Sequence, residues 1–138
     1  MKKLLLFPVV LLIMALLCSC SDVSKAKIDY GSSRLYSQSD MDSAIQKIFS
    51  EFRGFDGCIL DSITYLGDQS AGEDELKYCN SLADEKTYDE CIVFTSVFHT
   101  SEFLDDPIRE AGQTYEGWDW YLARTNGGEW DLVEYGYA

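Results

Sequence analysis

This 138-residue chain has few basic residues, a single histidine and no cysteines at the spacing of zinc ligands. Eleven Lys and Arg stand against 24 Asp and Glu, so the formal net charge is −13. A nucleic-acid-binding domain needs a basic surface to neutralise phosphates, so the charge excludes that class. The only histidine is His99, and no set of cysteines around it has zinc-ligand spacing. The sequence therefore predicts neither a metal site nor a cofactor.

The chain also lacks a hydrophobic run long enough to span a membrane comfortably. Its longest uncharged apolar run covers residues 4–17 and follows Lys2 and Lys3. As a helix this run would reach about 21 Å, whereas a bilayer core is about 30 Å thick. A short apolar run after positive residues is typical of a signal peptide.

Residues 17–20 read LCSC and resemble the bacterial lipobox, in which a leucine and two small residues precede a cysteine. In such signals the last cysteine is diacylated and becomes the first residue of the mature chain. We therefore predict a lipoprotein signal peptide at residues 1–19 and lipidation of Cys20. An ordinary secretory cleavage site is the alternative. Lipidation would hold the protein at the outer face of the bacterial cell membrane.

Three further cysteines follow this segment, at positions 58, 79 and 91. Disulfides form outside the cell, but an odd number leaves at least one thiol free. The first candidate disulfide joins Cys79 to Cys91, because it closes a modest loop. Its rival joins Cys58 to Cys91, and three free buried thiols are an equal alternative.

No internal repeat or low-complexity run divides the rest of the chain, which predicts one domain over residues 36–138. Residues 20–35 are polar and without clear periodicity. We interpret them as a flexible tether, whose root-mean-square reach of about 20 Å would lift the domain off the lipid headgroups.

One helix and two strands have clear patterns. Residues 39–54 repeat apolar side chains at helical spacing, with Ser39 and Asp42 as the expected capping pair. Residues 58–66 and 91–100 are rich in β-branched and apolar side chains, which predicts strands. The first of these has an irregular pattern at Leu60, which indicates either a β-bulge or burial on both faces of the strand.

The remaining segments predict a short helix, a long loop and a hairpin. The acidic stretch 73–82 fits one or two exposed helical turns, and residues 101–116 form a long loop. A loop at the NGG sequence would close a β-hairpin. A two-residue loop would put Trp130 on the opposite face from Trp120, and we favour a three-residue loop at 126–128 with Gly128 left-handed. This register gathers four large residues on one face, namely Trp120, Leu122, Trp130 and Leu132.

These elements predict an α+β fold, with the N-terminal helix packed on a curved, mostly antiparallel sheet of about four strands. Several motifs also resemble a family of short bacterial lipoproteins that contain a domain of unknown function. The resemblance implies a cystatin-like, nuclear-transport-factor-like cone and carries no catalytic residue. It rests on Gly31, Ser33, Tyr36, Ser37, Phe55, Gly57, Cys58, Leu60, Tyr65, Trp118, Trp120, Gly127, Gly128 and Trp130.

In such a cone the space between helix and sheet can hold a pocket. Aromatic residues at alternate strand positions would line it, or would simply form the core. His99 could act as a general base beside Asp119 or Asp131. The leading hypothesis is a non-enzymatic lipoprotein domain that binds an envelope protein, a cell-wall component or a small apolar ligand. A small enzyme and a structural envelope protein are the alternatives. The candidate lining residues are Tyr65, Phe94, Phe98, Trp118, Trp120 and Trp130.

Overall fold

A computed structural model describes residues 21–137 of the chain. The predicted signal peptide and Cys20 lie outside these residues. The described part is an α+β fold with two α-helices and five strands in one open, mixed sheet. Its elements are β1 (Lys27–Asp29), α2 (Gln38–Phe52), β2 (Cys58–Tyr65), a 3₁₀ turn η1 (Asp68–Ala71), α3 (Glu73–Leu82), β3 (Glu90–Thr100), β4 (Thr114–Arg124) and β5 (Asp131–Tyr137).

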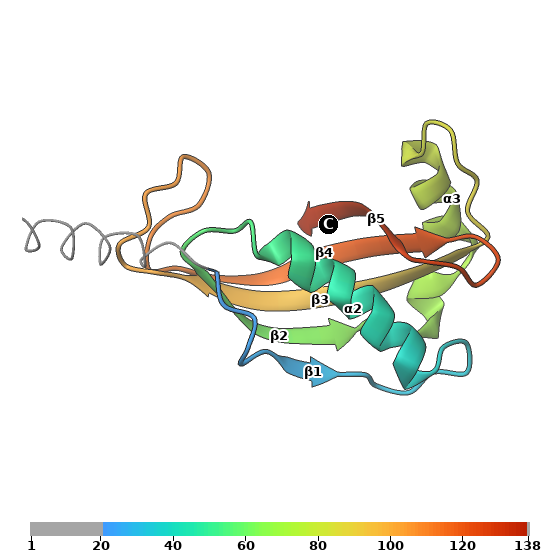
Figure 1. The fold of residues 1–138 in the computed structure, drawn as a ribbon, viewed down its shortest axis with the longest axis horizontal. Helices are drawn as coiled ribbons and strands as arrows, with labels where there is room; N and C mark the ends of the chain where they lie inside the picture. The colour runs from blue at the N-terminus through green and yellow to red at the C-terminus, as the bar shows by residue number, and fades with distance from the viewer. Residues whose placement is uncertain (1–20, 138) are drawn as a thin grey trace, which may run out of the picture.

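The five strands lie in their order along the chain, with β1 and β5 at the two edges. Strands β2 to β5 pair antiparallel, as expected, and a bulge after Leu60 interrupts β2. The expected count of four strands is too low, because β1 adds a fifth that runs parallel to β2. Figure 1 shows α2 lying across one face of this sheet.

Strand β1 falls inside the segment that we expected to be a flexible tether. Ile28 packs against the main hydrophobic cluster and pairs with Ile63. Further upstream, Asp22 donates its backbone N–H to Cys58 and accepts one from Leu60, at 3.0 and 2.8 Å. A three-residue strand with one apolar side chain is too short to give a periodic signal, which explains why the sequence did not predict it.

The N-cap of helix α2 lies two residues before the expected one. Ser37, not Ser39, is the N-cap, and it forms a reciprocal capping box with Asp40. Both serines are followed by an aspartate at the required spacing, so sequence spacing alone does not decide between them. The buried face is the expected one and consists of Met41, Ala44, Ile45, Ile48 and Phe52.

Strand alternation divides the buried residues between two faces of the sheet. The α2 face carries the main cluster, to which β3 contributes Ile92 and Phe94. The α3 face carries a smaller cluster of Cys79, Tyr88, Cys91 and Ala123. Cys91 and Ile92 are consecutive in β3, so their side chains point to opposite faces of the sheet. Cys79 of α3 shares a cluster with Cys91, which places α3 on the face opposite α2.

The β4–β5 connection differs in detail from the predicted hairpin loop. It spans residues 125–130, and the left-handed residues are Asn126 (φ 54°) and Gly127 (φ 63°), not Gly128. Gly128 closes the turn by donating to the Thr125 carbonyl at 3.1 Å. The shared face is nevertheless confirmed: the main cluster contains Trp120, Leu122 and Trp130, and Leu132 packs against it.

Candidate functional site

The six aromatic residues expected to line a pocket all lie on the α2 face. Five of them are buried in the main cluster, and Trp118 packs against it while staying partly exposed. Phe55 contacts both Trp118 and Trp120 from the segment after α2, with ring centroids about 6 Å apart. The described residues line three surface hollows, and of the six aromatic residues only Trp130 borders one of them.

The largest of these hollows is an open groove of about 580 Å³ between α2 and the β4–β5 connection. We call it the α2–hairpin groove. One wall is the exposed side of α2, which contributes Ser43, Gln46 and Lys47. The other wall is the turn around Gly128 and Glu129, and Lys47 forms an ion pair with Glu129 across the groove. Most of the lining groups are therefore hydrogen-bonding side chains.

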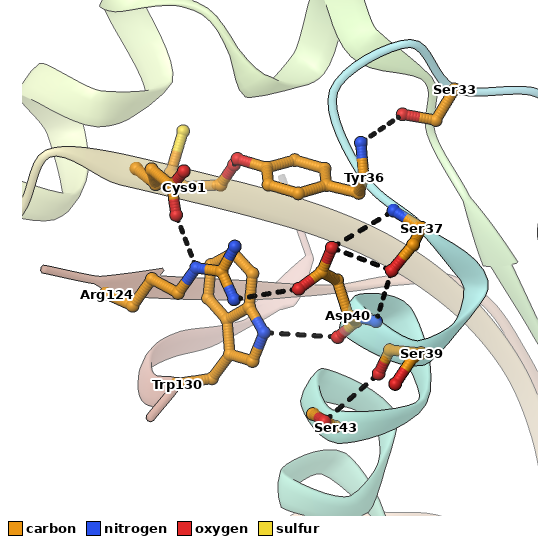
Figure 2. A network of polar contacts seen from close by, with 10 residues as sticks. Ser33, Tyr36, Ser37, Ser39, Asp40, Ser43, Cys91, Arg124 and Trp130 are labelled. Atoms are coloured by element: carbon orange, nitrogen blue, oxygen red, sulfur yellow. Dashed lines mark hydrogen bonds and ion pairs between the residues drawn. The ribbon is translucent and has the colours of Figure 1, made fainter. Parts of the chain in front are cut away.

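Arg124 forms the floor of the groove and is only 8% exposed. Its guanidinium lies over the Trp130 ring, 4.2 Å from the centroid, which is a favourable cation–π geometry. Nη1 donates to the Asp40 carboxylate at 3.1 Å, and Nε donates to Glu90. Figure 2 shows Arg124 between Trp130 and Asp40. The buried cation is thus held by three different elements.

Asp40 connects the start of α2 to this cation. Its carboxylate accepts hydrogen bonds from the Ser37 hydroxyl and backbone N–H, at 2.9 and 3.1 Å (Figure 2). These bonds, together with the contact to Arg124, hold the pKa of Asp40 below its usual range. Trp130 Nε1 donates to the Asp40 carbonyl at 3.1 Å. The groove floor is therefore fixed in place before any ligand arrives.

Tyr36 closes the network on the side of β3. Its hydroxyl donates to the Cys91 carbonyl at 2.7 Å, and its ring meets Trp130 edge-on with centroids 5.5 Å apart. Burial raises the pKa of Tyr36 well above its usual range, so this hydroxyl stays protonated and keeps donating. Neither Arg124 nor Asp40 was predicted as a site residue.

One sequence signal could have pointed to Arg124. It follows Trp120 and Leu122 at the same alternation, so it occupies an inward-facing position of β4. A cation at such a position requires a buried partner. The partner, Asp40, is far away in the sequence, and nothing in the pattern identifies it.

His99 contacts neither of the aspartates proposed for it. Its Nδ1 lies 2.9 Å from an oxygen of Asp61, the residue at the bulge of β2. Asp131 instead accepts from Lys86 and Tyr88. A carboxylate can orient a histidine as a general base. Within residues 21–137, however, no hydroxyl or thiol hydrogen-bonds to His99, so no nucleophile completes the arrangement.

All three described cysteines are buried free thiols. Cys79 and Cys91 pack in the same small cluster, as a disulfide between them would require. The disulfide itself stays a prediction. Burial raises the pKa of Cys79 to about 11 and of Cys91 to about 12. A nucleophilic cysteine needs a lowered pKa, so neither residue is in an environment that activates a thiol.

Residues 21–137 contain neither a group of metal ligands nor a membrane-spanning helix. No three His, Cys, Asp or Glu residues of this part are grouped so that they could hold a metal ion. Neither helix in it has the length and hydropathy that crossing a bilayer requires. Comparisons with protein-family models, curated proteins and solved structures find no match to the chain.

Proposed function

We propose that the chain is a membrane-anchored, extracytoplasmic lipoprotein whose domain binds an envelope protein at the α2–hairpin groove. The anchor rests on the LCSC motif after the short apolar run. The binding role rests on one observation: the groove floor is a buried arginine that Trp130, Asp40 and Glu90 hold in place. Fixing a polar surface in advance lowers the entropic cost of binding.

The groove suits a polar partner better than a small apolar ligand. The charge of Arg124 is balanced by two carboxylates, and Lys47 is balanced by Glu129. The accessible groups that remain include the uncharged side chains of Ser43 and Gln46. A protein segment that offers amide and hydroxyl groups matches these walls. Trp130 is the one aromatic residue that lines this groove, so the groove offers an apolar ligand little contact area.

The finer description of the fold is also part of this proposal. Helix α2 against the antiparallel strands β2 to β5 is compatible with the cystatin-like, nuclear-transport-factor-like cone, to which β1 would be an addition. Membership of the uncharacterised lipoprotein family rests on the sequence motifs alone. A solved structure of the mature chain with a strongly curved sheet would support the cone.

Site-specific photo-crosslinking in cells tests the groove. A crosslinking amino acid at Gln46, which is exposed in the groove, should yield a discrete adduct with an envelope protein. The matched control is Gln69, an exposed glutamine of η1 that does not line the groove. The Gln46 adduct should also disappear in a Ser43→Trp variant that fills the groove. Equal adducts at both positions, or none at Gln46, would contradict the binding role.

Metabolic labelling with a fatty-acid analogue tests the anchor. The wild-type chain should incorporate the label, and a Cys20→Ala variant should not. A Cys79→Ala variant is the control, because this cysteine is buried and should not affect acylation. Continued labelling of the Cys20→Ala variant would refute the assignment.

A small enzyme is the second candidate, and the His99–Asp61 pair is the observation that favours it. Both side chains are about 40% exposed, so a substrate could reach them. If this pair acts in catalysis, His99→Gln should abolish a hydrolytic activity of the purified chain, and Asp61→Asn should weaken it. An activity that is unchanged in the His99→Gln variant would exclude this role.

A further inference from the structure

The loop between β3 and β4, residues 101–113, carries the two most exposed large apolar side chains of the described residues. Phe103 is 93% exposed and Ile108 is 85% exposed. No other large apolar side chain of this part exceeds 60%. Single exposed apolar residues are common, but two nearly bare ones on the same loop are typical of a surface that contacts something apolar.

The loop is braced at its base. The Gly112 backbone N–H donates to the Ser101 carbonyl at 3.1 Å, and the Thr100 hydroxyl donates to the Glu110 carbonyl at 2.6 Å. Within the loop, Arg109 forms an ion pair with Asp106 at 2.6 Å. A loop held in this way can present Phe103 and Ile108 to a surface.

The described chain begins beside this loop. Asp22 hydrogen-bonds to Cys58 and Leu60, and the neighbouring Gly57 accepts a hydrogen bond from Ser101 at 2.8 Å. Figure 1 shows the loop and the first described residues at the same end of the sheet. Cys20 is two residues before Asp22, so the chain can separate their Cα atoms by about 7 Å at most. Acyl chains on Cys20 would therefore enter the bilayer close to the loop.

We propose that the 101–113 loop is a second membrane contact, in which Phe103 and Ile108 enter the lipid interface next to the acylated Cys20. This rests on the proposed lipid anchor. In this arrangement the domain lies directly on the bilayer and is not lifted off it by a flexible tether. Strand β4 has 11 residues, about 33 Å in length, and leads from this loop to Arg124. The α2–hairpin groove would then open far from the lipid, where an envelope protein can reach it.

Charge argues for lipid whose headgroups carry no net charge. The loop carries Glu102, Asp105, Asp106 and Glu110 against the single Arg109. Anionic lipids would repel it, whereas zwitterionic lipids would not. A second copy of the chain, which also has a net charge of −13, is disfavoured for the same reason.

Depth-dependent fluorescence quenching tests the contact on the acylated full-length product in phosphatidylcholine vesicles. An environment-sensitive dye is placed at Ile108→Cys, since the native described cysteines are buried. Lipids brominated in the upper part of the acyl chains should quench it at least about twofold, because an interfacial residue inserts about 5–10 Å into the headgroup–acyl boundary, close to these bromines. The same dye at Glu85→Cys, an exposed position just before β3 at the other end of the sheet, should stay unquenched.

Two further measurements make the outcomes decisive. Phe103→Ser should reduce the quenching at position 108, and anionic phosphatidylglycerol should reduce it in low salt. If the labelled chain is acylated and vesicle-bound but the dye at 108 is unquenched, the loop contact is wrong and the anchor stands. If the chain is not acylated and does not float with vesicles, both proposals fail. Energy transfer between loops of two copies would instead assign the surface to self-association.

Discussion

The two faces of the sheet are packed with different chemistry. The α2 face holds a continuous apolar cluster that includes Phe94, Trp120 and Trp130, all nearly inaccessible to solvent. The α3 face holds a small cluster built on Cys79 and Cys91. The free energy of burial scales with the apolar area removed from water. The α2 face should therefore carry most of the stability of the domain, while α3 mainly covers one end of the opposite face.

The polar network of Arg124 and Asp40 lies on the α2 face, which carries most of the stability. Arg124 and Asp40 both contact Trp130 of the main cluster: the Arg124 guanidinium lies over its ring, and its Nε1 donates to the Asp40 carbonyl. A buried charge is tolerated only where partners are fixed, and the aromatic packing supplies that rigidity. The groove therefore depends on the packing of the α2 face, whereas substitutions on the α3 face should leave it intact.

Neighbouring residues of β3 give the most direct test of this difference. Ile92→Ala removes a fully buried side chain from the α2 face and should lower the free energy of unfolding by about 2–5 kcal/mol. Cys91→Ala, one residue away on the α3 face, should cost about 1 kcal/mol or less. Urea denaturation of both variants measures the two losses. Equal losses of free energy would show that the α2 face does not carry most of the stability.

The groove network should show the second largest effect. Arg124→Met keeps most of the side-chain volume but leaves Asp40 and Glu90 without their cation. Breaking a fully buried pair costs about 3–5 kcal/mol, and these carboxylates are partly exposed, so we expect about 2 kcal/mol. Lys47→Met is the matched control and should change stability by less than about 1 kcal/mol, because its pair with Glu129 is at the surface.

The sequence predicts the periodic parts of the fold well. The buried side of α2 and the shared face of Trp120 and Trp130 follow from local spacing. The irregular pattern at Leu60 allowed a bulge or burial on both faces, and the structure has the bulge. Strand β1 could not be predicted, because three residues with one apolar side chain carry no period. The start of α2 was ambiguous, since two serines offered the same capping spacing.

The candidate site is less predictable because it depends on distant pairings. Asp40 and Arg124 meet only after α2 has docked on the sheet. The pairing of His99 with Asp61 similarly depends on the register of β2 against β3 and on the bulge between them. The aromatic residues expected to line a pocket were placed on the correct face, but packing fills that face with their rings.

A hydrogen bond that connects the two faces should have a smaller effect. The Tyr36 hydroxyl donates from the α2 side to the carbonyl of Cys91, whose thiol belongs to the α3 cluster. Tyr36→Phe leaves that carbonyl without this donor and should cost about 1 kcal/mol in urea denaturation. Tyr30→Phe removes a hydroxyl that donates to Asp42 at a more exposed site, and it should cost less. A larger loss for Tyr30→Phe would show that burial does not govern these bonds.

The last expected effect is an alkaline weakening to which Cys79, on the α3 face, contributes. The pKa of Cys79 rises on folding from 9.0 to about 11, so the unfolded chain loses this proton first as the pH increases. The folded state is therefore favoured fully below about pH 9, and this contribution is lost as the pH rises towards 11. Urea denaturation of the wild type and of Cys79→Ala at pH 7 and pH 10 should show a smaller loss in the variant. Cys58→Ala provides the comparison on the α2 face, where burial also raises the thiol pKa. If the pH dependence of the Cys79→Ala variant equals that of the wild type, this thiol does not lose its proton first in the unfolded chain, and the α3 cluster does not hold it neutral.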